Sequence, residues 1–174
     1  MNDLAERKFE EFKNVGIENA LNAGLSFIES KDYKYIGRLD CGDINLQNKY
    51  TKQLEYLDRN PETYLLGTWA EMVDLQGNFL YTLEHPIEDK EIKNQMYLNS
   101  MFVHPTVIFR KEVLKLIGKY PTKYKAAEDY AYFFEMAKKL KVENLPEALL
   151  IYKVDPNSIS STKRKSQVIN RTKI

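Results

Sequence analysis

Helix-type and strand-type hydrophobic patterns alternate along the chain, and this alternation limits the fold more than any other feature of the sequence. No internal repeat and no low-complexity linker interrupts it. A mixture of this kind predicts an α/β structure, in which helices pack in layers against a sheet. With 174 residues the chain fits one domain. A domain of this size buries roughly 70% of the surface that its unfolded chain exposes.

The spacing of apolar residues and the turn signals place the individual elements. We expect helices over residues 3–29 (in two pieces that meet near Gly16), 49–59, 89–98, 111–118 and 128–140. We expect strands over residues 33–39, 64–74, 79–82, 101–110 and 148–152, with a turn at 76–78. Proline lacks the amide hydrogen that a sheet needs, so Pro105 predicts an edge or a bend within the strand at 101–110.

Charge and cysteine content exclude several classes of function. The formal net charge is +1, from 26 basic and 25 acidic residues, so we expect no nucleic-acid partner. Cys41 is the only cysteine, which excludes an internal disulfide and a Cys-x-x-Cys metal site. The first residues are charged and no apolar stretch follows them, so we expect neither a signal peptide nor a membrane span, and a cytoplasmic location.

The C-terminal segment differs in charge from the rest of the chain. Residues 161–174 contain five basic and no acidic residues, and we treat them as a basic tail that follows a domain at 1–160. One interpretation is a solvated end. The other is contact with an anionic membrane surface, to which each basic residue contributes about 1 kcal/mol. The sequence leaves both open.

Two carboxylates, Asp40 and Asp43, stand where the predicted strand at 33–39 runs into a loop. Hard divalent cations such as Mg²⁺ and Mn²⁺ take oxygen ligands, so these side chains are candidate ligands, directly or through water. The alternative is that both residues only shape the loop, as turn residues or as the N-cap of the next helix.

A second acidic pair, Glu128 and Asp129, opens the predicted helix at 128–140. Asp129 is a candidate base that takes a proton from a hydroxyl group: a helix N-terminus keeps its carboxylate ionised but also weakens it as a base, an effect that nearby apolar groups or Glu128 would have to offset. The alternative is helix capping, with Asp129 accepting backbone amides and Glu128 facing water.

His104 and Arg110 lie in and at the end of the apolar run Met101 to Arg110. His104 reads as a hydrogen-bonded core histidine, or as a residue that lines an acceptor pocket or binds metal. Arg110 reads as a partner for phosphate or for a surface carboxylate. Trp69 and Tyr120 could stack on sugar rings, but core packing explains them equally well, so we assign them no role in the site.

Seven motifs taken together resemble family-2 glycosyltransferases of the GT-A fold. They run in the family's order across about residues 16 to 160: Tyr35-Ile-Gly-Arg-Leu-Asp-Cys-Gly-Asp43, Lys52-Gln-Leu-Glu-Tyr-Leu57, Leu66-Gly-Thr-Trp69, His104-Pro-Thr-Val-Ile-Phe-Arg110, Ala127-Glu-Asp129, Asn144-Leu-Pro146 and Asn157-Ser-Ile-Ser160. The resemblance implies a Rossmann-like domain that moves a sugar from a nucleotide-diphosphate sugar to a saccharide or lipid-linked acceptor hydroxyl, with inversion. The usual products are bacterial surface polysaccharide or lipopolysaccharide, made in the cytoplasm or at the inner face of the membrane.

The resemblance also implies roles for particular residues. Arg38, Asp40 and Asp43 would belong to the loop that binds the diphosphate and Mg²⁺ or Mn²⁺, and Asp129 would be the catalytic base. His104 and Glu128 would lie on the acceptor side. The family pattern has a further carboxylate where this chain has Gly42, which leaves open whether the metal is held by Asp43, by Asp40 or only weakly.

One departure from the family pattern concerns the first residues. Family members usually begin with two strands that hold the nucleoside, whereas this chain starts with residues like those of the helix that follows, including Gly16-Ile-Glu-Asn-Ala-Leu-Asn22. We therefore expect an N-terminally incomplete GT-A fold that binds nucleotide sugar poorly by itself. The alternative to an enzyme is a non-catalytic remnant that needs a partner polypeptide for donor binding.

Overall fold

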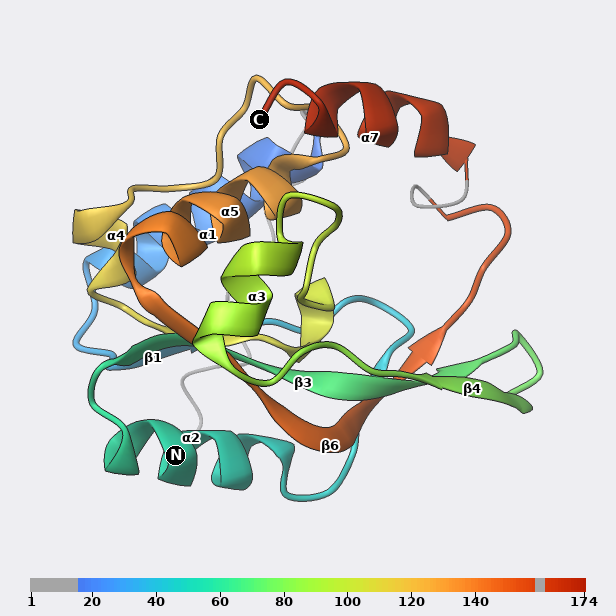
Figure 1. The fold of residues 1–174 in the computed structure, drawn as a ribbon, viewed down its shortest axis with the longest axis horizontal. Coiled ribbons are helices and arrows are strands. Elements are labelled where there is room, and N and C mark those ends of the chain that lie inside the picture. Colours follow the sequence, from blue (N-terminus) through green and yellow to red (C-terminus); the bar gives the residue numbers. More distant parts are fainter. Residues whose placement is uncertain (1–15, 159–161) are drawn as a thin grey trace, which may run out of the picture.

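The computed structural model describes residues 16–158 and 162–174. In this part of the chain a six-stranded sheet forms the centre, and helices lie on both of its faces (Figure 1). None of the described helices is both long and apolar enough to cross a membrane. The helical piece predicted before Gly16 lies outside the described residues.

Helices and strands alternate as expected from the sequence. The helices are α1 (Ile17–Glu29), α2 (Lys49–Arg59), α3 (Asp89–Gln95), α4 (Val113–Leu116), α5 (Glu128–Lys139) and α7 (Arg164–Arg171). The strands are β1 (Tyr35–Gly37), β2 (Ile44–Asn45), β3 (Thr63–Val73), β4 (Phe79–Leu83), β5 (Ile108–Arg110) and β6 (Lys141–Lys153).

The long strand β3 organises the sheet. The strand order is β1-β5-β3-β6-β2, and β4 also pairs with β3. The pairing of β3 with β6 is parallel, and the other pairings are antiparallel. Most residues of β3 are buried, as in a strand that is covered on both faces.

Apolar side chains fill the space on each side of the sheet. The larger cluster includes residues of α1, α3 and α5, among them Leu25, Ile92 and Phe133. A smaller cluster joins Leu57 of α2 to Leu66 of β3. Figure 1 shows the corresponding layers, with α2 on one face of the sheet and α1, α3 and α5 on the other.

Two of the predicted strands differ from the structure, and proline explains both differences. The prediction of a strand over 101–110 is wrong for its first half. His104–Thr106 form a 3-10 turn that contains Pro105, and only Ile108–Arg110 join the sheet. The strand predicted at 148–152 is much longer, because the pairing register shifts between Thr68 and Trp69 of β3 and so accommodates Pro146 within β6.

The segment interpreted as a basic tail contains the helix α7. Asn170 Nδ2 donates a hydrogen bond to the carbonyl of Lys125 at 2.8 Å, and Arg171 donates to Asn99 Oδ1 at 2.5 Å. These contacts place α7 against the loops that precede α5 and follow α3.

Candidate active site

The guanidinium group of Arg38 connects two distant segments of the chain. Its Nε donates a hydrogen bond to Asp40 Oδ1 at 2.5 Å, and its Nη1 lies 2.7 Å from His104 Nε2. Only 14% of the Arg38 side chain is exposed. The antiparallel pairing of β1 with β5 explains this contact. Gly37 lies opposite Ile108, so the residues that follow β1 lie beside the residues that precede β5.

The His104 side chain is largely enclosed, with 10% of it exposed. Its ring packs edge-on against Phe133, with the ring centres 5.4 Å apart, and its Nε2 lies 2.9 Å from the hydroxyl of Tyr120. Burial, together with the charge of Arg38, holds the pKa of His104 well below its ordinary value. His104 is therefore a hydrogen-bonded core histidine, as one interpretation expected, and its Nδ1 also lies 3.7 Å from Asp129 Oδ2.

Asp129 stands in the first turn of α5 with its carboxylate turned toward His104. Its Oδ1 accepts a hydrogen bond from the amide of Tyr130 at 2.7 Å, and 35% of the side chain is exposed. Burial raises the pKa of Asp129, and the charge of Asp40 adds to the rise, while Arg38 opposes it. A carboxylate with a raised pKa is a stronger base than an ordinary aspartate, and this one is both oriented and accessible.

Glu128 does not face water, so that part of the capping interpretation is wrong. The residue is only 5% exposed, and its Oε2 is buried without a hydrogen-bond partner among the described residues. Burial raises the pKa of Glu128, and the neighbouring charges of Asp129 and Glu18 raise it further. The N-cap of α5 is Ala127, and no side chain caps this helix.

The loop after β1 carries Asp40 and Asp43 on a tight turn. The amide of Asp43 donates to the carbonyl of Asp40 at 3.2 Å, and Gly42 adopts a φ of 96°, which favours glycine. Asp43 is not a helix cap, because the N-cap of α2 is Asn48. Its Oδ1 accepts a hydrogen bond from the amide of Lys153 at 3.2 Å, whereas its Oδ2 is buried without a partner among the described residues.

The residues of this loop fit a divalent cation only if a ligand completes the coordination. Among residues 16–158 and 162–174, no group of three or more His, Cys, Asp or Glu side chains is arranged to hold a metal ion. The buried Oδ2 of Asp43 has no hydrogen-bond partner among the described residues, while Asp40 already accepts from Arg38. Mg²⁺ commonly uses one or two carboxylates together with substrate phosphates, so these two carboxylates suffice for such a shared site.

Two polar residues that were not assigned to the site from the sequence belong to this region. Lys49 is buried, donates to the carbonyl of Pro105 at 2.8 Å, and has a pKa that burial lowers to about 8. Tyr120 contacts His104, and burial raises the pKa of its hydroxyl. Lys49 begins α2 and its sequence neighbours give no sign that it is buried, whereas Tyr120 was considered only as a stacking residue and was set aside in favour of core packing.

Arg110, by contrast, takes no part in the site, and both expected partners were wrong. The side chain is buried, and its Nε donates to the carbonyl of Thr63 at 2.8 Å. Its Nη2 donates to the carbonyls of Leu57 at 2.6 Å and Asn60 at 3.1 Å. Arg110 therefore holds the C-terminal end of α2 against the sheet.

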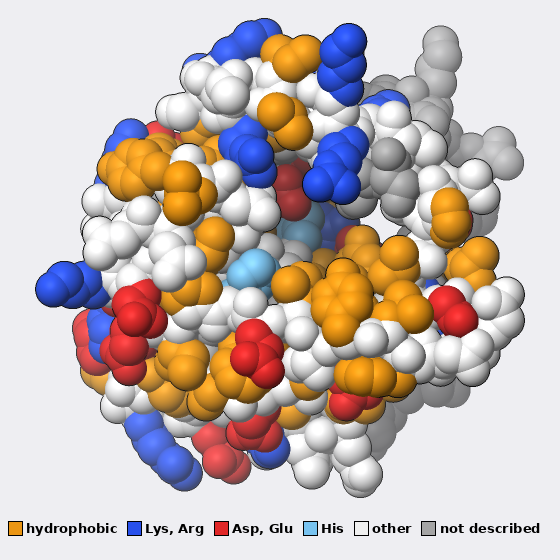
Figure 2. Space-filling model, turned by 45° about the vertical axis from the view of Figure 1, so that its right-hand side comes forward, with side chains coloured by type: hydrophobic (Ala, Val, Ile, Leu, Met, Phe, Trp, Pro, Cys, Tyr) orange, Lys and Arg blue, Asp and Glu red, His pale blue; other side chains and the backbone are white. Residues whose placement is uncertain are grey.

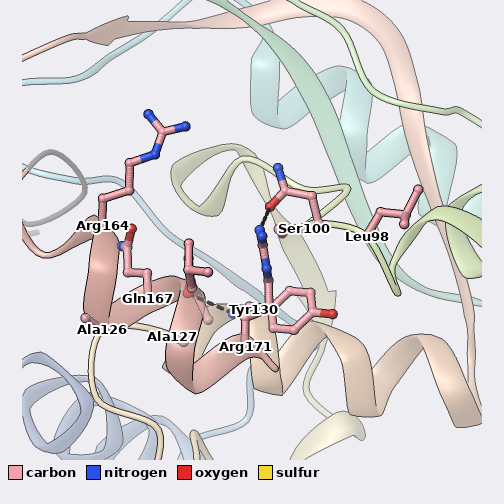
Figure 3. A pocket seen from close by; sticks show the side chains of 11 residues that line it. Leu98, Ser100, Ala126, Ala127, Tyr130, Arg164, Gln167 and Arg171 are labelled. Carbon is pink, nitrogen blue, oxygen red and sulfur yellow. Dashed lines mark hydrogen bonds between the residues drawn. The ribbon is translucent and has the colours of Figure 1, made fainter. Parts of the chain in front are cut away.

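Asp129 also lines a pocket of about 420 Å³ between α5, α7 and the loop after α3. Figure 2 shows a hollow with a histidine and an acidic side chain in its floor and basic side chains on its upper rim. Figure 3 shows that α7 supplies one wall of this pocket, with Arg164, Gln167 and Arg171. The pocket thus places a candidate base opposite a basic helix.

Comparison with known proteins gives matches over most of the chain. The family model described as "Glycosyl transferase family 2" matches residues 7–118. The amylovoran biosynthesis glycosyltransferase AmsE of Erwinia amylovora is 31% identical, over 88% of this chain and 55% of its own length. A UDP-Gal:alpha-D-GlcNAc-diphosphoundecaprenol beta-1,3-galactosyltransferase of Escherichia coli is 27% identical, over 79% of this chain and 49% of its own length. The chain thus spans about half the length of these curated relatives.

A solved structure supports the fold. The crystal structure of residues 1–349 of S. aureus TarS superposes with a TM-score of 0.60 at 16% sequence identity, covering 82% of this chain and 42% of that one. The described residues therefore have part of the fold of that protein, in agreement with the incomplete GT-A fold expected from the sequence.

Proposed function

This chain belongs to glycosyl transferase family 2, and we propose that it transfers a sugar from a nucleotide-diphosphate sugar to an acceptor hydroxyl, with inversion at the anomeric carbon. Its place would be the synthesis of a surface polysaccharide or lipopolysaccharide. Two relatives support this assignment: one is named for amylovoran biosynthesis, and the other for transfer of galactose from UDP-Gal to a lipid-linked diphosphate sugar.

The observation that carries the proposal is the position of Asp129. Its Oδ2 lies 3.7 Å from the neutral His104, at the wall of an open pocket. In the proposed reaction the acceptor hydroxyl gives its proton to Asp129, and its oxygen forms a bond to the anomeric carbon. The bond from that carbon to the nucleotide diphosphate breaks on the opposite side, so the configuration inverts.

The loop after β1 would serve the donor. We assign the leaving diphosphate, with Mg²⁺ or Mn²⁺, to Asp43 and Asp40, because Asp43 Oδ2 is free and both carboxylates lie on one turn. When bound, the cation would neutralise charge on the departing diphosphate. Arg38 fixes Asp40 and lowers the pKa of Asp129, so it links the donor loop to the base.

His104 and Glu128 would act on the acceptor side by positioning Asp129. His104 is neutral, so it can orient the carboxylate without forming an ion pair that would weaken the base. Burial, with a contribution from the charge of Asp129, raises the pKa of Glu128, so the two neighbouring carboxyls influence each other. The basic helix α7 fits a peripheral location at the inner face of a membrane.

Sugar transfer by an Asp129→Asn variant tests the proposal. We would measure transfer from a panel of nucleotide sugars to saccharide and lipid-diphosphate acceptors, with Mn²⁺ or Mg²⁺ present. Loss of the base should reduce the rate by about 10²- to 10⁴-fold. Glu135→Gln is the matched control, because Glu135 lies on the same helix and pairs only with Lys138 and Lys139 among the described residues.

Two results would contradict this function. One is an Asp129→Asn variant that folds and transfers sugar at the wild-type rate. The other is a product that retains the configuration of the donor, as read by NMR of the anomeric proton, because a single displacement can only invert it.

A further inference from the structure

The pocket that contains Asp129 has a second, oppositely charged wall. Leu98, Asn99 and Ser100 line one side, the start of α5 lines the floor, and α7 closes the other side (Figure 3). Its volume of about 420 Å³ lies within the range of small-molecule sites, which is roughly 300–1,000 Å³. The reaction proposed above uses only the carboxylate in this floor.

Arg164 and Arg171 both line this pocket from α7. They are seven residues apart, so they lie on one face of the helix, separated by two turns or about 10 Å. Arg171 donates to the amide oxygen of Asn99 and has no carboxylate partner among the described residues. Arg164 has neither a hydrogen bond nor an ion pair with the described part of the chain.

The charge of α7 is therefore not balanced by carboxylates of the described residues. None of the ion pairs among the described residues involves a basic residue of this helix. Guanidinium groups bind phosphate in bidentate fashion, with more specificity than an ammonium group can offer. Two such groups facing one pocket form a site for an anion with several oxygens.

The mouth of the same pocket is apolar. Leu98 is 74% exposed and Val168 is 44% exposed, and both line it. Large exposed aliphatic side chains next to arginines that have no carboxylate partner among the described residues suit a ligand that joins an anionic group to a hydrocarbon chain. The pocket thus combines a candidate base, a pair of cations and apolar surface.

We propose that Arg164 and Arg171 bind the phosphate or diphosphate group of the acceptor, and that the acceptor is a lipid-linked diphosphate sugar whose hydroxyl faces Asp129. This inference rests on the proposed function, and it adds the acceptor class and the residues that recognise it. Asn99 holds Arg171 in the position that this contact requires.

Binding of farnesyl diphosphate to this chain tests the inference without any need for turnover. Titration calorimetry in the presence of a chelator keeps the loop of Asp40 and Asp43 from binding the probe through a metal. We expect the Arg164→Gln, Arg171→Gln double variant to bind at least tenfold more weakly than the wild type. Lys165→Gln is the control for the loss of one charge from the same helix, because Lys165 does not line the pocket; it should change the affinity less than twofold.

Further probes distinguish the sources of the anion. Farnesol should bind much more weakly than farnesyl diphosphate. The affinity for inorganic pyrophosphate should fall in the same double arginine variant. Affinity for vesicles that contain phosphatidylglycerol should fall in proportion to the charge removed, about half as much in Lys165→Gln as in the double arginine variant, because a membrane surface senses only the total charge.

Three results would overturn the inference: no binding of the diphosphates at millimolar concentration, equal binding of farnesol, or an equal loss of affinity in Lys165→Gln. Failure of the proposed function has a different signature. If Asp129 is not a base, Asp129→Asn transfers sugar normally while diphosphate binding still depends on the arginines. If only the inference fails, Asp129→Asn loses transfer and the arginine variants bind the diphosphates normally.

Discussion

Burial determines the charge state of the titratable side chains around the site. It lowers the pKa of His104 and raises the pKa of Asp129, so the first is neutral and the second is a better base than an exposed aspartate. It also raises the pKa of Asp43 to about 6, with the charge of Asp40 adding to the effect. Asp43 and Asp129 must be ionised in order to bind a cation or accept a proton. Because burial disfavours the ionised form of each, the ionised carboxylates lower the stability of the folded protein.

The Asp43→Asn variant should show this cost as a pH-dependent gain in stability. Folding raises the pKa of Asp43 to about 6. The protonated carboxyl is tolerated in the folded protein, so stability is highest below the pKa of the unfolded chain, and it falls as the pH rises through the folded value. The ionised form of Asp43 therefore destabilises the wild type at pH 8. Because Asp43 is partly open to solvent, we expect the variant to be more stable by about 1 kcal/mol at pH 8, and equal at pH 4.

Thermal unfolding with a chelator, at both pH values, measures this difference. Asp32→Asn, at an exposed carboxyl, is the control and should leave the melting temperature unchanged at both. A gain for Asp43→Asn that is larger at pH 4 than at pH 8 would disprove the account of this residue.

The helix α2 depends on Arg110 for its connection to the sheet. The guanidinium group donates to carbonyls of Leu57, Asn60 and Thr63, at the helix end and at the start of β3. Removing it leaves buried carbonyls without a donor and takes away a cation from the negative end of the helix dipole.

We therefore expect Arg110→Met to lower the free energy of unfolding by about 3 kcal/mol. Urea denaturation measures this change. Lys115→Gln, an exposed site on α4, should stay within about 0.5 kcal/mol of the wild type. Equal stability of the Arg110 and Lys115 variants would show that these carbonyls do not need Arg110.

Elements with strong local signals could be predicted from the sequence, and those that depend on distant partners could not. Residues 49–59 were predicted as a helix and form α2, because Leu54 and Leu57 mark its apolar face and Pro61 stops it. The first half of β6 was missed, since Pro146 argues against a strand unless an irregularity in the pairing with β3 leaves it unpaired, as happens between Leu145 and Ala148. The role of Arg110 was missed because its acceptors come from segments about 50 residues away.

The same distinction applies to the site as a whole. The sequence indicated Arg38, His104 and Asp129 separately, and sheet pairing with helix packing brings them together. β1 lies against β5, which places the loop after β1 beside the turn of His104, and α5 packs Phe133 against the ring of that histidine. The basic wall was missed because α7 has few apolar residues to mark it as a helix. The roles of these residues in catalysis stay predictions.

The central claim is that acidic groups from separate segments act on one another in a single site, and the pKa of Asp129 tests it most directly. Carbon-13 NMR of the side-chain carboxyl would follow its titration in the wild type, in Asp40→Asn and in Arg38→Gln, with no metal present. We predict a wild-type pKa above the ordinary value for aspartate, a lower pKa in Asp40→Asn and a higher one in Arg38→Gln, with no change in Glu135→Gln. An Asp129 that titrates like an exposed aspartate and responds to neither substitution would contradict the claim.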